Sequence, residues 1–173
     1  TNDANFQNAT FTNDANFQNA TFTNNAYFRG ATFNRDANFG GATFTNNAYF
    51  WGATFNRDAY FWGATFNRDA NFQGATFTND ANFQGATFTN ADFERATFTN
   101  ADFERATFTN DANFQNATFT NDANFQDATF TRSAPPRGLP PKQVDEDGLP
   151  HGARWADADD EGLEAGSPDD APR

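Results

Sequence analysis

The side chains that could do chemistry in this chain are few and unevenly placed. The chain has one histidine, His151, and no cysteine. Between residues 1 and 132 there is no Ser, Lys or His, so no Ser–His or Cys–His pair can form within that stretch. A glycine-rich phosphate-binding loop is also absent from the sequence. The composition therefore argues against an enzyme, and we expect no catalytic residue, no cofactor and no metal ion.

Carboxylates are the metal-ligating groups that recur regularly. Taken every 22 residues, they and equivalent asparagines form two series, which are Asp14, Asp36, Asp58 and Asp80, and Asp3, Asn25, Asn47 and Asp69. One interpretation is a ladder of cation sites. The other is that Asp and Asn close turns through side-chain hydrogen bonds to the backbone. We favour the second, because each position offers too few oxygens for a calcium site.

Aromatic and basic side chains concentrate between residues 27 and 68. Most other copies of the local pattern carry Asn or Gln at the aromatic positions. Exposed Trp, Tyr and Arg are typical of the residues that dominate protein–protein binding energies, although aromatic ladders can also simply stiffen a sheet. The predicted partner-binding patch comprises Tyr27, Arg29, Tyr49, Trp51, Tyr60, Trp62, Arg35, Arg57 and Arg68. A 22-residue register brings Trp51 over Arg29, where a cation–π pair could form, and puts Tyr60 and Trp62 on the opposite face.

A tandem repeat positions these side chains. All 24 Phe lie between Phe6 and Phe130, and the residue two before each of them is Ala. Consecutive Phe residues are five residues apart in 14 steps and six apart in 9; the two spacings alternate, except for four fives in a row between Phe88 and Phe108. Residues two apart point the same way from an extended chain. Each Ala-x-Phe unit is therefore predicted to be a very short strand with Ala and Phe inward, and the residues between units to form a corner.

Two other geometries share an eleven-residue period. A right-handed helical coiled coil is one, but it needs apolar spacings of three and four, and Asn, Thr, Gly and Phe are mediocre or poor helix formers. A two-sided solenoid with eleven residues per coil is the other, and it remains as a rival prediction.

The units resemble those of the pentapeptide-repeat family, whose pattern A-(D/N)-(L/F)-x-x is matched by ADFER at residues 91–95 and 101–105. The resemblance covers residues 4 to about 132. It implies an all-β fold, a right-handed quadrilateral β-helix with four units per coil and with Phe and Ala stacked inside. With 24 units the solenoid would have about six coils and a length of roughly 25–30 Å. The six-residue steps depart from the family pattern, and we interpret them as longer corners that make room for four Phe rings per coil.

The predicted β-helix spans residues 1–132, and residues 133–173 are predicted to be a disordered Pro-rich acidic tail. Every Pro lies in that second segment, whose composition is typical of disorder. The formal net charge is −12 and divides evenly between the segments, so the repeats are only mildly acidic and direct nucleic-acid binding is not expected. No apolar run approaches the length of a membrane span, and we expect a cytoplasmic location.

Three functions fit the sequence. The leading hypothesis is a non-catalytic scaffold that presents a rigid surface to a protein partner. The family resemblance implies a second, a DNA mimic that modulates a type II topoisomerase (gyrase), because some members resemble duplex DNA in shape and charge. The third is ice binding through Thr-x-Thr ladders, which Asn34, Asn56 and Asn67 interrupt. Uncapped coil ends further predict a homodimer or end-to-end association.

Overall fold

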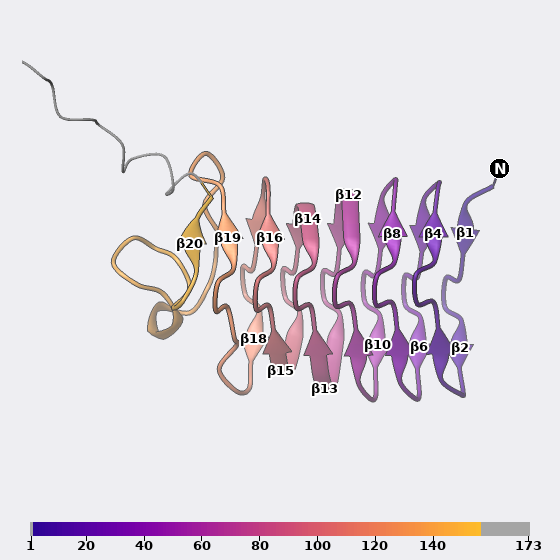
Figure 1. The fold of residues 1–173 in the computed structure, drawn as a ribbon. Coiled ribbons are helices and arrows are strands. Elements are labelled where there is room, and N and C mark those ends of the chain that lie inside the picture. The colour runs from indigo at the N-terminus through magenta and orange to yellow at the C-terminus, as the bar shows by residue number, and fades with distance from the viewer. Residues whose placement is uncertain (1, 157–173) are drawn as a thin grey trace, which may run out of the picture.

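The chain winds into a four-sided parallel β-solenoid in the computed structural model, which describes residues 2–156 (Figure 1). Each Ala-x-Phe unit lies on one side of a coil, and the 24 units make six coils, which comprise residues 4–25, 26–47, 48–69, 70–90, 91–111 and 112–132. Sides one to four begin with β1, β2, β3 and β4. The elements are β1 (Ala4–Asn5), β2 (Thr10–Phe11), β3 (Ala15–Asn16), β4 (Thr21–Phe22), β5 (Ala26–Tyr27), β6 (Thr32–Phe33), β7 (Ala37–Asn38), β8 (Thr43–Phe44), β9 (Ala48–Tyr49), β10 (Thr54–Phe55), β11 (Ala59–Tyr60), β12 (Thr65–Asn71), β13 (Thr76–Asn82), β14 (Thr87–Asp92), β15 (Thr97–Asp102), β16 (Thr107–Phe108), β17 (Ala112–Asn113), β18 (Thr118–Phe119), β19 (Thr129–Phe130), the 3₁₀ helix η1 (Pro141–Gln143) and β20 (Arg154–Trp155).

Strand pairing decides between the two predicted solenoids. Ala4 pairs with Ala26 and Thr43 pairs with Thr65, so partners in parallel strands are 22 residues apart. The strands form one sheet of 11 strands and one of 9. The quadrilateral solenoid is therefore confirmed, and the two-sided rival with eleven residues per coil is wrong.

Tight corners follow sides one and three. At each of them the Ala N–H donates to the Phe carbonyl three residues earlier, as Ala53 does to Phe50 at 3.0 Å. This turn needs a positive φ at the residue before Ala, and Gly52, with φ of +63°, meets that need without steric cost. Residues with positive φ occupy the position at all twelve tight corners: Asn8, Asn19, Gly30, Gly41, Gly52, Gly63, Gly74, Gly85, Arg95, Arg105, Asn116 and Asp127.

Wide corners follow sides two and four and hold the sixth residue of the long steps. Where the next coil has a shorter corner, the register changes at the corner alone: it shifts between Phe66 and Asp69, while the flanking Ala-x-Phe units stay aligned. Thr87 accordingly pairs with Thr107, only 20 residues on. Because the extra residue lies between two Ala-x-Phe units, even where one strand such as β12 runs through the corner, every Ala and Phe keeps its inward direction, as predicted.

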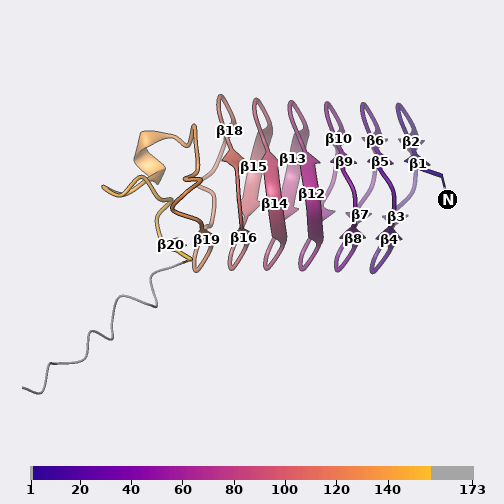
Figure 2. The same cartoon turned by 90° about the horizontal axis from the view of Figure 1, so that it is seen from above.

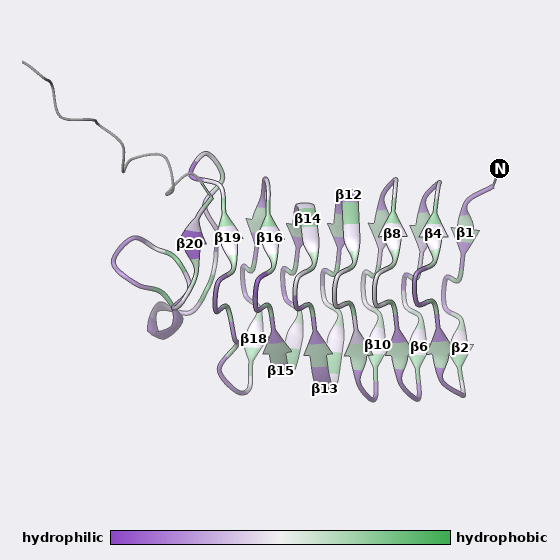
Figure 3. Cartoon of the chain, in the orientation of Figure 1, coloured by the Kyte–Doolittle hydropathy of each residue, from purple (hydrophilic) through white to green (hydrophobic). Residues whose placement is uncertain are grey.

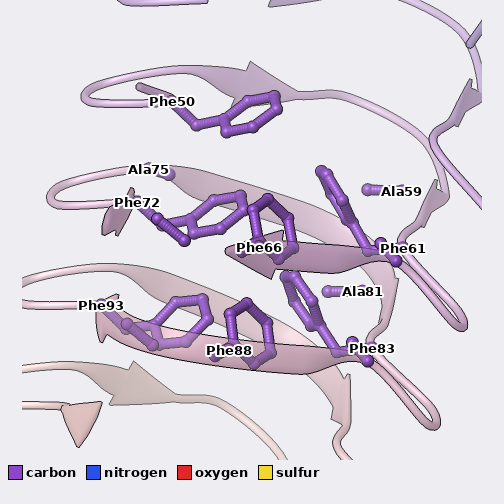
Figure 4. Packing of buried hydrophobic residues seen from close by; sticks show 14 of the residues in the cluster. Phe50, Ala59, Phe61, Phe66, Phe72, Ala75, Ala81, Phe83, Phe88 and Phe93 are labelled. Atoms are coloured by element: carbon purple, nitrogen blue, oxygen red, sulfur yellow. The ribbon is translucent and has the colours of Figure 1, made fainter. Parts of the chain in front are cut away.

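The core is four columns of phenylalanine rings backed by alanine. Figure 4 shows parts of the columns from sides one, three and four. Within a column the rings stack at centroid distances from 4.6 Å (Phe108–Phe130) to 5.2 Å (Phe98–Phe119). Across the coil, rings from sides one and three meet edge to face, as Phe50 and Phe61 do at 5.4 Å and 89°. The stacking distance equals the spacing of paired strands, so the backbone ladder and the aromatic columns have the same period. Figure 3 shows hydrophobic stretches recurring from coil to coil along the solenoid, with hydrophilic stretches between them.

The expected disorder from residue 133 onward is wrong for residues 133–156. They lie across the end of the solenoid that is remote from the N-terminus (Figures 1 and 2). β20 pairs with β19 as a seventh rung of side four, and Leu149 is only 3% exposed within the core. Arg132 also lies over Trp155, with its Cζ 5.4 Å from the ring centroid. We call residues 133–156 the end segment; the rest of the predicted tail, residues 157–173, lies outside the described residues.

Candidate protein-binding surfaces

Four predicted residues form a continuous surface on side one of coils two and three, here called the side-one patch: Tyr27, Arg29, Tyr49 and Trp51. Tyr27 and Tyr49 stack with ring centroids 5.0 Å apart and planes 7° from parallel. The Arg29 Cζ lies 5.0 Å from the centroid of the Trp51 ring, so the cation–π geometry expected from the register is present. Trp51 remains 47% exposed. The β5–β9 pair sets this arrangement, because it holds each outward residue beside its equivalent in the next coil.

The tyrosine hydroxyls of the side-one patch are held by wide-corner amides. The Asn25 Nδ2 donates to the Tyr27 hydroxyl at 3.2 Å, and the Asn47 Nδ2 donates to the Tyr49 hydroxyl at 3.0 Å. Each tyrosine is therefore held in two ways, by stacking of its ring on the other tyrosine and by a hydrogen bond to its hydroxyl. A surface held in this way loses little conformational entropy when a partner binds.

A second surface, the side-three patch, consists of Tyr60 and Trp62 on the far side of coil three. Residues 59–63 repeat residues 48–52 as AYFWG, half a coil later. Trp62 is 38% exposed and lies flat on Gly40, where a Cβ would come within 2.5 Å or less of the indole ring. Gly40 occupies on side three of coil two the position that Arg29 occupies on side one, so Trp62 packs on a glycine and Trp51 packs on an arginine.

The Tyr60 hydroxyl has a different partner from the other two tyrosines. It donates to the Asp58 Oδ2 at 3.0 Å. Burial raises the pKa of Tyr60 above its ordinary value of 10.0; the hydrogen bond to Asp58 and the negative charges of Asp58, Asp36 and Asp80 raise the pKa further. The environment of the side-three patch is thus acidic, whereas that of the side-one patch contains amides and an arginine.

The remaining predicted residues, Arg35, Arg57 and Arg68, lie exposed in wide corners. Arg35 and Arg57 follow side two in successive coils, next to side three, whereas Arg68 follows side four, next to side one. The nine predicted residues therefore divide between two opposite faces, as the register implied for Tyr60 and Trp62, and they do not form one patch.

The regularly spaced carboxylates hydrogen-bond to the neighbouring coil. The Asp58 Oδ1 accepts from the Asp80 backbone N–H at 3.3 Å and from the Asn79 Nδ2. Likewise the Asn90 Nδ2 donates to Asp69 at 2.8 Å, and the Asn100 Nδ2 donates to Asp80 at 2.7 Å. Such ladders lock adjacent wide corners together. Among the described residues no three His, Cys, Asp or Glu side chains form a group that could hold a metal ion.

Side-chain turns at the outward positions of sides one and three were not anticipated. Nine Asn or Asp side chains there accept from the backbone N–H two residues later, as the Asn71 Oδ1 does from Gln73 at 3.0 Å. The three exceptions among the twelve units are Tyr27, Tyr49 and Tyr60. The sequence signal was the Asn or Asp that precedes most tight corners. The comparison of the twelve units shows that each of the three tyrosines takes the place of such a turn-stabilising residue.

Shallow polar grooves along the wide corners were also missed. One, of about 430 Å³, is lined by Asp69, Asn90, Asp111 and Arg137 among others, where coils four to six meet the end segment. A second, of about 260 Å³, lies on the opposite wide corner beside Asp80 and Asp122. Both lie where the coils shorten, at and beside the run of five-residue steps between Phe88 and Phe108.

Threonine ladders occupy sides two and four, as expected. Several of the hydroxyls are already bonded to the protein: the Thr78 Oγ1 donates to the Phe55 carbonyl at 3.0 Å, and the Thr109 Oγ1 donates to that of Phe88 at 3.2 Å. Asn34 and Asn56 interrupt side two and hydrogen-bond to each other at 3.1 Å.

His151 is exposed in the end segment. No helix in residues 2–156 is long and apolar enough to cross a membrane.

Comparison with known proteins accounts for the repeat. A family model described as pentapeptide repeats (9 copies) matches residues 1–43, 17–65, 61–107 and 93–135, well over half of the chain. The chain belongs to the pentapeptide-repeat family. Among solved structures, the chain matches that of QnrB1, described as a plasmid-mediated fluoroquinolone resistance protein, which is 15% identical, with 92% of this chain and 89% of that chain covered and a TM-score of 0.22. No curated protein sequence matches this pentapeptide-repeat chain.

Proposed function

We propose that this pentapeptide-repeat protein is a non-catalytic scaffold that binds a protein partner through the side-one patch. The observation that carries the proposal is Trp51, a large aromatic side chain left 47% exposed on a rigid sheet and packed against Arg29. Trp, Tyr and Arg are the residue types that contribute most to protein–protein binding energies. Each tyrosine here also takes the place of a turn-stabilising Asn or Asp, which supports a role other than closing the corner.

The proposal is tested by capture and by measured affinity. The variant Y49A/W51A removes half of the patch, and Y60A/W62A makes the same two changes in the identical AYFWG segment on the opposite face. Proteins bound by the wild-type chain from a lysate of its source organism would be identified by mass spectrometry. Each would then be purified and its affinity for all three chains measured by calorimetry.

We expect the Y49A/W51A variant to lose at least about a hundred-fold in affinity, because two central aromatic side chains typically contribute more than 2 kcal/mol each. The Y60A/W62A control should bind its partner within a few-fold of wild type, and circular dichroism should be the same for all three chains. Partners that bind equally well to Y49A/W51A would refute the proposal.

A DNA mimic that modulates gyrase is the second candidate. It is supported by the carboxylates that recur along the wide corners, including Asp14, Asp36 and Asp58. Arg35 and Arg57 interrupt that series, and the net charge of residues 1–132 is only −6, from 13 acids and 7 arginines. A gyrase supercoiling assay at micromolar protein separates the candidates: inhibition of supercoiling supports DNA mimicry, and unchanged supercoiling refutes it.

Ice binding is favoured less, because protein carbonyls already accept hydrogen bonds from several threonine hydroxyls.

A further inference from the structure

Two of the three tryptophans in this chain are each covered by an arginine of the same chain. The Arg29 Cζ lies 5.0 Å from the centroid of the Trp51 ring, and the Arg132 Cζ lies 5.4 Å from that of Trp155. Such pairs form because a guanidinium is attracted to the electron-rich face of an indole. Trp62 is the third tryptophan, and within the described part of the chain no arginine or lysine lies over its ring. The side-three patch therefore holds an indole without a cation.

One face of the Trp62 indole is free. A Cβ on Gly40 would overlap the Cε2, Cζ2 and Nε1 atoms of the indole, so the other face of the ring lies on the Gly40 backbone. Tyr60 pairs with Asn38, and the Gly41 N–H donates to the Trp62 carbonyl at 2.8 Å, so the strand holds Trp62 in this place. Trp62 is nevertheless 38% exposed. Its free face is therefore a platform of fixed position.

A polar groove of about 230 Å³ runs beside the platform, along the wide corner that leads into side three. Carboxylates and amides line it, and no basic residue does: the lining residues are Asp14, Ala15, Asn16, Asp36, Asn38 and Tyr60. Neither Asp14 nor Asp36 forms a salt bridge within the described chain. The groove thus offers two carboxylates whose charges no ion pair neutralises.

Two arginines share this wide corner and leave it negative. Arg35 and Arg57 are exposed, and neither forms an ion pair among residues 2–156. Burial raises the pKa of Tyr60, and the hydrogen bond to Asp58 and the charges of nearby carboxylates raise it further. The charge around the free indole face therefore favours a cation as its occupant.

We propose that the side-three patch binds a basic segment of another protein, with an arginine of that segment stacked on the free face of Trp62 and a second cationic side chain in the groove beside Asp14 and Asp36. Arginine fits better than lysine, because a planar guanidinium stacks on an aromatic face and pairs with a carboxylate through two N–H groups. Residues two apart in an extended segment are about 6.6–6.8 Å apart. Tyr60 and Trp62 are themselves two apart, so an Arg-x-Arg segment matches the platform and the groove.

This site is independent of the partner proposed for the side-one patch. One stacked arginine and one solvated ion pair give a dissociation constant on the order of 1 mM. Binding of this strength is lost during capture from a lysate, so proteins captured in that experiment report on the side-one patch. The side-three patch needs a direct titration.

The titration uses the peptide Gly-Arg-Gly-Arg-Gly, acetylated and amidated, and nuclear magnetic resonance of the whole chain. The reporter is the indole N–H signal of Trp62, which the W62F variant identifies. We expect this signal to shift on binding, while that of Trp155, already covered by an arginine, stays in place. The same peptide with lysine should bind at least about three-fold more weakly. The peptide with citrulline, which is planar but uncharged, should bind at least about ten-fold more weakly.

Matched variants separate this site from a general attraction of the peptide to an acidic protein. D36N removes one charge from the groove and should weaken binding at least about three-fold, whereas D111N removes one charge from the opposite wide corner and should leave binding unchanged. W62L, followed through the Gly40 amide signal, should weaken binding at least about five-fold. Equal effects of D36N and D111N, equal binding of the arginine and citrulline peptides, or no shift of the Trp62 signal at millimolar peptide would overturn the proposal.

Discussion

Truncating one interior ring should cost far more in the middle of the solenoid than at its open end. Phe61 and Phe17 occupy the same column on side three. Phe61 is fully buried and lies between two stacked rings, at 4.9 Å from Phe39 and 5.0 Å from Phe83. It also meets Phe50 and Phe72 edge to face, at 5.4 and 5.3 Å. Phe17 is half-buried and stacks on Phe39 alone, at 4.9 Å.

The free energies follow from these contacts. Replacing a fully buried Phe by Ala typically costs about 3–5 kcal/mol, the lost transfer energy plus the cavity left behind. Phe61→Ala should fall in that range, because stacked coils on both sides prevent the cavity from collapsing. Phe17→Ala loses one stacking partner and a ring that water already reaches, so we expect about 1–2 kcal/mol.

Urea denaturation followed by circular dichroism measures both free energies, at a protein concentration low enough for a single chain. The most informative quantity is the difference between the two losses in free energy of unfolding, because both variants lose the same atoms from the same column. Equal losses at the two positions, or a loss below about 1 kcal/mol for Phe61→Ala, would refute the stacked-column core.

Three further outcomes are expected. First, Leu149→Ala should lower the free energy of unfolding by about 2–4 kcal/mol in urea denaturation, because this side chain is 3% exposed in the core cluster; a disordered segment would show no loss. Second, Arg29→Ala should remove the cation–π contact, lower stability by less than about 1 kcal/mol and change the fluorescence of Trp51; an unchanged spectrum would contradict the contact. Third, in a Y27F/Y49F background, ultraviolet titration should give Tyr60 a pKa above its ordinary 10.0 in the folded chain, and Asp58→Asn should lower that pKa. Because the folded pKa is raised, this contribution to stability is present below pH 10 and is lost as pH rises through the folded pKa.

The inward direction of Ala and Phe could be predicted because the repeat encodes it directly. Residues two apart share a face in an extended chain, and the variable spacing always falls between units, where a corner can absorb it. The same register placed Trp51 beside Arg29 and put Tyr60 on the opposite face. Each of these placements follows from the position of a residue within the repeat, which can be read from the sequence alone.

The end segment could not be predicted, because its order depends on a distant surface. Its prolines and acids are typical of disorder, and its apolar residues are sparse. What orders it is the open end of coil six, which offers a strand edge to β20 and a hydrophobic pocket to Leu149. The polar grooves were missed for a related reason, since they arise from the changing size of successive coils and not from any single repeat.

The central claim is that Ala-x-Phe units of successive coils pair side by side, 20 to 22 residues apart. Disulfide cross-linking tests this pairing most directly. The chain has no cysteine, and a disulfide needs Cα atoms about 4.4–6.8 Å apart. The pairs T43C/T65C and T87C/T107C join residues that face each other in paired strands, at separations of 22 and 20. The pair T54C/T65C joins sides two and four across the coil. The account predicts intramolecular disulfides in the first two variants and none in the third under mild oxidation; a disulfide in T54C/T65C, with none in the other two, would contradict it.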